Sequence, residues 1–135
     1  MKFIDTNVLL YAAGYEQDDI PKQQRALQLL ARGDCVMSGQ VLAEFYFNAT
    51  SVRKLGLPHD IAVEWLDDFR RFTIVPVTVD IVARGAANAK RFQISYWDAA
   101  ILAAAEEIGA DTLYTEDLNH GQRYGSVRVI NPFLD

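Results

Sequence analysis

The stretch Lys2-Phe3-Ile4-Asp5-Thr6-Asn7 decides the fold class, because it joins a short apolar segment directly to a carboxylate. Phe3 and Ile4 predict a buried strand, and the apolar run over residues 8–13 predicts a helix immediately after it. In open α/β sheets, ligands bind in the crevice beyond the carboxyl ends of the strands, which is where Asp5 would lie. Asp5, Thr6 and Asn7 are also good helix caps, so the motif alone leaves a structural and a functional interpretation open.

The rest of the chain continues this alternation with short links. We expect further strands at residues 35–37, 73–77, 112–115 and 127–130. A polar loop is expected over residues 15–19, and helices over 7–13, from Pro21 to Gly33, and over 40–54, 59–72, 78–92 and 96–108. This order predicts an α/β protein with a three-layer fold, in which a mainly parallel central sheet is flanked by helices, and a single domain spanning residues 1–135.

Several local signals refine this scheme. Pro76 favours an edge position or a strand end for the strand at 73–77. The spacing of apolar residues predicts the inward faces of two helices: Val41, Leu42, Phe45, Ala49 and Val52 in the helix over 40–54, and Ile81, Val82 and Ala86 in the helix over 78–92.

Composition narrows the class of protein. Half of the 135 residues are hydrophobic and 23% are charged, which is typical of a globular domain. The net charge of −5 argues against broad electrostatic binding of nucleic acid, although metal-binding carboxylates make a sequence look more acidic than the loaded protein. Cys35 is the single cysteine, which excludes an internal disulfide and a Cys-based zinc cluster. We expect a cytoplasmic protein without a signal peptide or membrane segment, since the longest apolar run covers only residues 99–105.

Acidic residues occur at positions that an α/β fold would bring together. Asp5 and the segment Thr115-Glu116-Asp117 follow strands, and Glu44 lies on the flank of a helix. Asp98 opens a helix whose next seven residues are apolar on every side, so that helix is predicted to be buried. Each acid also has a structural explanation, such as the capping box that Ser95 and Asp98 would form. Together they favour an oxygen-ligand site for Mg²⁺ or Mn²⁺ and not for zinc.

The ordered set of short motifs resembles the PIN-domain ribonucleases, and among them the VapC-type toxins of toxin–antitoxin pairs. The resemblance rests on four segments and covers nearly the whole chain: Asp5-Thr6-Asn7, Glu44 within Leu-Ala-Glu-Phe, Trp97-Asp98-Ala99-Ala100 at the head of an alanine-rich helix, and Thr115-Glu116-Asp117 after a strand.

This resemblance implies a PIN-like fold and a metal-dependent endoribonuclease that uses Mg²⁺ or Mn²⁺. It also implies an RNA substrate, a homodimer, and inhibition by a cognate antitoxin protein in a type II toxin–antitoxin system. By position, Asp5, Glu44 and Asp98 would be catalytic metal ligands, with Asn7 and Thr115 as polar supports. Either Glu116 or Asp117 would be the fourth acid, and we favour Asp117 because Thr115-x-Asp117 matches the family spacing.

Two other classes of protein compete with this interpretation. A non-catalytic PIN-like binding module would lack the acidic set, which is complete here. A phospho-receiver domain would need a lysine late in the chain, but the last lysine is Lys90. Candidate RNA contacts are less specific, since they also suit solvated helix ends or core packing: the pairs Arg53-Lys54, Arg70-Arg71 and Lys90-Arg91, the aromatic residues Tyr46, Trp65 and Trp97, and the loop histidine His120.

Overall fold

Helices and strands alternate along the chain as the sequence predicts. The structure is a computed structural model that describes residues 1–14 and 19–134, so most of the loop expected at 15–19 lies outside the described residues. The elements are β1 (Lys2–Ile4), α1 (Thr6–Ala12), α2 (Ile20–Ala31), β2 (Cys35–Ser38), α3 (Gly39–Thr50), α4 (His59–Phe69), β3 (Thr73–Val75), α5 (Val79–Phe92), α6 (Tyr96–Glu107), β4 (Thr112–Tyr114), β5 (Arg123–Tyr124) and β6 (Val127–Ile130).

The six strands form one sheet in the order β3-β2-β1-β4-β6-β5. All neighbouring strands pair in parallel except β5 and β6, which are antiparallel. From β1 the chain adds strands first on one side, through β2 and β3, and then on the other, through β4 and β6. The strand order therefore reverses between β1 and β4, where parallel α/β sheets open a crevice for ligands.

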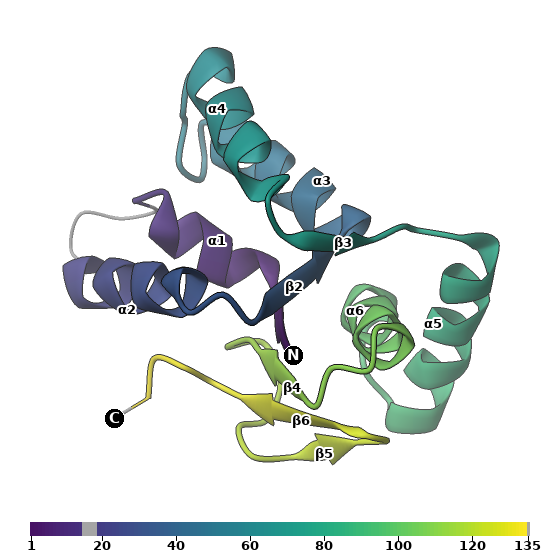
Figure 1. The fold of residues 1–135 in the computed structure, drawn as a ribbon. Coiled ribbons are helices and arrows are strands. Elements are labelled where there is room, and N and C mark those ends of the chain that lie inside the picture. Colours follow the sequence, from purple (N-terminus) through teal and green to yellow (C-terminus); the bar gives the residue numbers. More distant parts are fainter. Residues whose placement is uncertain (15–18, 135) are drawn as a thin grey trace.

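Helices cover both faces of the sheet, which gives the expected three layers. Figure 1 shows α1 and α2 on one side of the sheet and α5 and α6 on the other, with α3 and α4 extending beyond β3. Phe3, Ile4 and Leu113 of the two central strands are almost completely buried, as expected for strands covered on both faces. The expected α/β fold with a mainly parallel sheet is confirmed.

Helix α3 ends four residues earlier than the sequence predicts. It stops at Thr50, because the chain turns back on itself and the backbone N–H groups of Lys54 and Gly56 both donate to the Ser51 carbonyl at 3.0 and 2.9 Å. Gly56 has a φ of +63°, a left-handed conformation that glycine adopts without steric cost. Val52, predicted to face the core, lies in this turn and is 93% exposed.

The inward face of α5 also differs from the prediction. Ile81 and Gly85 are buried, whereas Val82 and Ala86 are exposed. A Cβ atom on Gly85 would lie 3.0 Å from the Cα and Cβ atoms of Ala100, so α5 and α6 approach each other at the place where neither carries a large side chain. The close approach of two backbones, and not the apolar stripe, fixes the rotation of α5.

The strand β5 is absent from the sequence-based scheme. It is only two residues long, and a two-residue loop joins it to β6, with Tyr124 paired to Val127. Gly125 has a φ of +60° at the first loop position, where a type II′ hairpin takes glycine. Elsewhere the prediction for strand edges is confirmed, since β3 is an edge strand and Pro76 follows its last residue.

Candidate metal centre

Asp5 follows β1 and is the N-cap of α1, so the prediction that it could cap the first helix is confirmed. Its Oδ1 atom accepts from the backbone N–H of Thr6 at 2.6 Å. Its Oδ2 atom accepts from the Thr115 hydroxyl at 2.7 Å. Asp5 is only 3% exposed, and these two bonds fix both of its oxygens at the crevice between β1 and β4. The cap therefore also delivers a buried carboxylate to the crevice.

The segment after β4 brings a second carboxylate to the same place. The Thr115 hydroxyl, having donated to Asp5, accepts from the backbone N–H of Asp117 at 3.1 Å and from Asn7 Nδ2 at 3.3 Å. Asn7 Nδ2 also donates to Asp117 Oδ2 at 3.1 Å. Because β1 and β4 are neighbours, these side chains connect residues more than 100 positions apart and hold Asp117 toward Asp5.

Asp98 reaches the site from the opposite face of the sheet, at the first turn of α6. Ser95 caps this helix: its hydroxyl accepts from the backbone N–H of Asp98 at 3.2 Å and donates to Asp98 Oδ2 at 3.1 Å. The next seven residues, 99–105, are all buried, as the sequence predicts. The half-buried Asp98 therefore stands at the open end of a helix that runs through the core.

The three carboxylates converge. One oxygen each from Asp5, Asp98 and Asp117 lies within 4.8 Å of the other two. Burial raises the pKa of Asp5 from 3.8 to about 7, with the Thr115 bond opposing the shift and the Asp117 and Glu44 charges adding to it. Burial likewise raises the pKa of Asp98, and the neighbouring charges of Asp117 and Glu44 add to that shift. The cluster is thus a place where negative charge is costly and a cation is favoured.

No ion pair joins these three carboxylates to a lysine or arginine in the part of the chain that the structure describes. Among the same residues, Asn7 Oδ1 is a buried oxygen without a hydrogen-bond partner. An uncompensated acidic cluster beside an unpaired oxygen fits a divalent cation with its bound water, since Mg²⁺ and Mn²⁺ prefer oxygen ligands.

Glu44 lies on the wall of the same cavity but outside the group of three. Its Oε2 atom accepts from the Thr6 hydroxyl at 3.1 Å, and its Oε1 atom accepts from Gln40 Nε2 at 3.1 Å. Both oxygens are therefore oriented by neighbouring side chains, one on α1 and one on α3. The cavity has a volume of about 260 Å³, and Glu44 faces it together with the three clustered acids.

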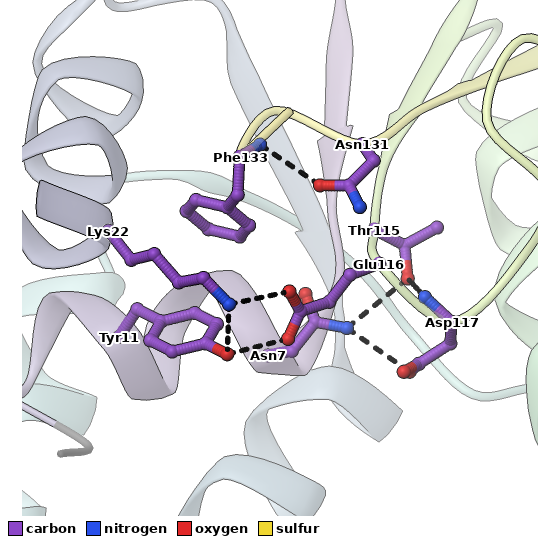
Figure 2. Close-up of polar contacts among 8 residues, drawn as sticks. All are labelled: Asn7, Tyr11, Lys22, Thr115, Glu116, Asp117, Asn131 and Phe133. Atoms are coloured by element: carbon purple, nitrogen blue, oxygen red, sulfur yellow. Dashed lines mark hydrogen bonds and ion pairs between the residues drawn. The ribbon is translucent and has the colours of Figure 1, made fainter. Parts of the chain in front are cut away.

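Glu116 lines the same cavity, but its carboxylate is bound to other residues and does not belong to the group of three. Its Oε1 atom accepts from the Tyr11 hydroxyl at 2.7 Å, and its Oε2 atom lies 3.4 Å from Lys22 Nζ. Figure 2 shows Glu116 pointing toward Lys22 and Tyr11, while Asp117 points toward Asn7. Of the two residues between which the sequence leaves the fourth acid open, Asp117 is the one whose carboxylate lies in the cluster.

The basic and aromatic residues considered as RNA contacts are dispersed. Lys54 lines the cavity, whereas Arg70 and Arg71 pair with Asp67 and Asp68 on α4. Other members of the set have local partners or lie at the surface: Tyr46 hydrogen-bonds to His59, Trp65 packs on Phe69, Arg91 lies over Phe92, His120 accepts from the Asn131 backbone, and Trp97 is 62% exposed.

Two residues around the site escape the sequence analysis, namely Tyr11 and Lys22. Tyr11 lines the cavity from the first helix, and Lys22 reaches Tyr11 and Glu116 from the second. Their partner Glu116 is 94 positions or more away in the chain, so no local pattern marks them.

Solved structures with similar folds place this geometry among known proteins. The VapC20 toxin of Mycobacterium tuberculosis, described as cleaving the sarcin–ricin loop, matches with a TM-score of 0.71 and 20% identity over 95% of this chain and 99% of that one. A toxin–antitoxin complex from Klebsiella pneumoniae matches with a TM-score of 0.71 and 20% identity over 98% of each chain. VapBC2 from Rickettsia felis, bound to a DNA fragment from its promoter, matches with a TM-score of 0.64 and 18% identity over 95% of this chain and 96% of that one.

These likenesses concern the fold, because the identities are low. No curated protein sequence matches the chain. The model of the PIN domain family, by contrast, matches residues 2–125, a range that contains Asp5, Asp98 and Asp117 and nearly the whole sheet. This match overturns the phospho-receiver alternative. From the sequence match and the three converging carboxylates together, we conclude that the chain belongs to the PIN-domain family.

Proposed function

We propose that this protein is a metal-dependent endoribonuclease that acts as the toxin of a toxin–antitoxin pair. The observation that carries the proposal is the convergence of Asp5, Asp98 and Asp117, from three separate elements, within a cavity that Glu44 also lines. A binding module without catalysis would have no need for three carboxylates whose mutual repulsion is uncompensated within the described chain. The similar fold of the sarcin–ricin-loop-cleaving toxin supports RNA as the substrate.

In this proposal Asp5, Asp98 and Asp117 would hold Mg²⁺ or Mn²⁺, and Glu44, which lines the same cavity, would complete the acidic set. A bound divalent ion would supply two kinds of chemistry, polarising the phosphodiester and lowering the pKa of a coordinated water. The chain's own residues orient the ligands: Thr115 fixes Asp5, Ser95 fixes Asp98, and Asn7 fixes Asp117.

Lys54 is the cation best placed to meet the RNA backbone, since it lines the cavity that the carboxylates occupy. Its position is set by the turn after α3, where its own N–H is bonded to the Ser51 carbonyl. A lysine there would pair with a phosphate of the substrate and offset the repulsion between RNA and the acidic cavity. The neighbouring Arg53 does not line the cavity and therefore offers a matched control.

The partners follow from the same structural relatives. Toxin–antitoxin complexes of this fold support a cognate antitoxin as the binding partner, and a homodimer is expected. Without metal, the acidic cavity is a suitable receptor for an inserted arginine or lysine of an inhibitor. We expect the protein to act in the cytoplasm, on cellular RNA. The structure contains no helix, among its described residues, that is long and apolar enough to cross a membrane.

The test is cleavage of a mixture of structured RNAs by the purified protein with Mg²⁺, with Mn²⁺ and with EDTA. We expect cleavage that requires metal, that is lost in Asp98→Asn, and that is weakened in Lys54→Met more than in Arg53→Met. Cleavage in EDTA, or equal cleavage by Asp98→Asn, would contradict the mechanism. A metal-loaded, folded protein that binds RNA without cleaving any of it would favour the binding-module alternative.

A further inference from the structure

Three residues beside the acidic cluster form a closed triangle of polar contacts, which we name the Lys22 triad: Tyr11, Lys22 and Glu116. The Tyr11 hydroxyl donates to Glu116 Oε1 at 2.7 Å, and Lys22 Nζ lies 3.1 Å from the Tyr11 oxygen and 3.4 Å from Glu116 Oε2. Figure 2 shows these three side chains meeting from α1, from α2 and from the segment after β4. The triad therefore ties the loop that carries Asp117 to two helices.

Aromatic rings hold the lysine in this place. Lys22 Nζ lies 4.8 Å from the ring centre of Tyr11 and 5.7 Å from that of Phe133. The two rings meet edge to face at 4.8 Å, and the backbone N–H of Phe133 donates to the Asn131 side chain at 2.9 Å. The Lys22 side chain is 36% exposed. A cation enclosed by two rings and a carboxylate has less conformational freedom than a surface lysine, so its contact with Glu116 is better defined.

Asp117 directly follows Glu116 of the triad in the chain. Asp117 is the most exposed of the three clustered carboxylates, and Asn7 donates a hydrogen bond to its side chain. The two residues that precede Asp117 are both held by side-chain contacts: Thr115 is bonded to Asp5, and Glu116 belongs to the Lys22 triad. The contacts of Glu116 therefore restrain the chain directly before Asp117, in addition to the bonds that Asp117 makes with Asn7 and Thr115.

We propose that Lys22 is a positioning residue for the metal site: it holds Glu116 against Tyr11, out of the cluster, and thereby keeps Asp117 directed at Asp5 and Asp98. This inference rests on the proposed function, because it takes the cluster to be the site of a divalent cation. Lys22 does not touch the cluster itself, so it acts through its two partners, Tyr11 and Glu116. Residues of this kind, which orient metal ligands from outside, strongly affect metal affinity in other proteins.

The direction in which Lys22→Met changes the affinity for a divalent cation distinguishes a positioning role from a purely electrostatic one. Removing a positive charge near a cation site strengthens cation binding if only Coulomb forces act. If Lys22 positions Asp117, then Lys22→Met weakens binding despite that advantage. We therefore expect calorimetric titration with Mn²⁺ alone, at fixed pH, to show about tenfold weaker binding for Lys22→Met. Glu116→Gln should also weaken Mn²⁺ binding. The double variant Lys22→Met, Glu116→Gln should bind Mn²⁺ about as tightly as the single variant with the lower affinity, because both substitutions disrupt the same set of contacts.

Two variants serve as controls. Lys22→Arg retains the charge and the contact with Glu116, and it should restore most of the affinity. Arg25→Met removes the same charge one turn further along α2, where the arginine donates to the Pro132 carbonyl and not to Glu116. This variant should bind Mn²⁺ as the wild type does or slightly more tightly. Thermal unfolding in EDTA, expected to be nearly the same for all of them, checks that each variant is folded.

The outcomes distinguish this inference from the proposed function. If the wild type binds Mn²⁺, and Lys22→Met binds it equally or more tightly, positioning by Lys22 is wrong while the metal site stands. If Lys22→Met and Arg25→Met weaken binding to the same degree, the effect belongs to the charge of α2 and the inference also fails. If the wild type binds no more Mn²⁺ than Asp98→Asn, both the metal site and the role of Lys22 are overturned.

Discussion

Among the described residues, two groups of three carboxylates differ in whether a cationic side chain compensates them. On the surface of α5 and α6, Arg84 Nη1 lies 2.6 Å from Glu107 and 3.5 Å from Asp80, and Nη2 lies 3.8 Å from Glu106. In the cavity, one oxygen each of Asp5, Asp98 and Asp117 lies within 4.8 Å of the other two, but no cationic side chain of the described chain pairs with them. The surface carboxylates, which solvent would screen in any case, are thus paired with an arginine. The cavity carboxylates, whose negative charge is costly because of burial, are not paired with a cationic side chain.

This contrast indicates which carboxylates of an acidic protein have a role beyond folding. Exposed carboxylates around an arginine contribute little to stability, and they can be exchanged with small effect. Buried carboxylates without a cation destabilise the folded chain, so their presence indicates a role outside folding. Four predictions test this contrast.

The largest effect is expected from neutralising one acid of the cavity cluster. Asp98→Asn retains the hydrogen bond to Ser95 through its amide oxygen but removes a ligand charge. RNA cleavage should fall at least about 100-fold, because the bound ion is asked to supply several kcal/mol of transition-state stabilisation. In EDTA, the melting temperature of the variant should equal or exceed that of the wild type. A variant that is both inactive and strongly destabilised would instead assign Asp98 a structural role.

Metal should stabilise the wild type and leave this variant unchanged. At an ion concentration a hundred times the Kd, binding to the folded state adds about 2.7 kcal/mol to the free energy of unfolding. For a chain of this length that is roughly a 10 °C increase in the melting temperature. Differential scanning fluorimetry with Mn²⁺ measures it, and EDTA should reverse it. An equal increase for Asp98→Asn would show that the ion binds elsewhere.

The metal-free protein should lose stability as the pH rises through the weakly acidic range. The folded-state pKa of Asp5, about 7, exceeds its unfolded value of 3.8, so the folded chain binds this proton more tightly. The contribution is fully present below pH 4 and is lost by about pH 7, at most about 4 kcal/mol for this group. Urea unfolding in EDTA at several pH values in this range measures the contribution of Asp5. The free energy of unfolding should fall with rising pH more steeply in the wild type than in Asp5→Asn.

The smallest effect is expected at the arginine-centred group. Arg84→Met leaves Asp80, Glu106 and Glu107 without their cation, but these carboxylates are partly or largely exposed, and solvent screens them. The free energy of unfolding should fall by about 1 kcal/mol or less, and less still at high salt. RNA cleavage should be unchanged. A large loss of cleavage in this variant would contradict the view that only the cavity carboxylates take part in catalysis.

Much of the fold was predictable because it depends on local signals. Alternating elements, capping residues and the all-apolar run at 99–105 depend on neighbours in the chain, and each led to the observed element. On the inward face of α5, the prediction was confirmed for Ile81 and wrong for Val82 and Ala86, because Gly85 carries no apolar side chain to mark the contact with Ala100. The early end of α3 and the two-residue strand β5 depend on turns at Gly56 and Gly125, whose conformations were not inferred from the sequence.

The site was predictable in part for a similar reason. Asp5, Asp98 and Asp117 stand at the ends of elements, and parallel topology brings such ends together, so their convergence follows from the fold. The distinction between Glu116 and Asp117 does not. It depends on Lys22 and Tyr11, which come from other helices, and on the length of each side chain. The catalytic and metal-binding roles of the whole set remain predictions, and the experiments above address them.

The pairing of β1 with β4 has a consequence for how the protein is made. The two strands meet across more than 100 residues, and Thr115 bonds to Asp5 only after they have met. During synthesis β1 can pair with β2 early, but its other edge stays unpaired until residues 112–114 have left the ribosome, and contacts between such distant residues form late. A nascent or truncated chain that ends before β4 has the first aspartate but no cluster. The acidic site would thus exist only after the ribosome has released β4 and the segment that carries Asp117.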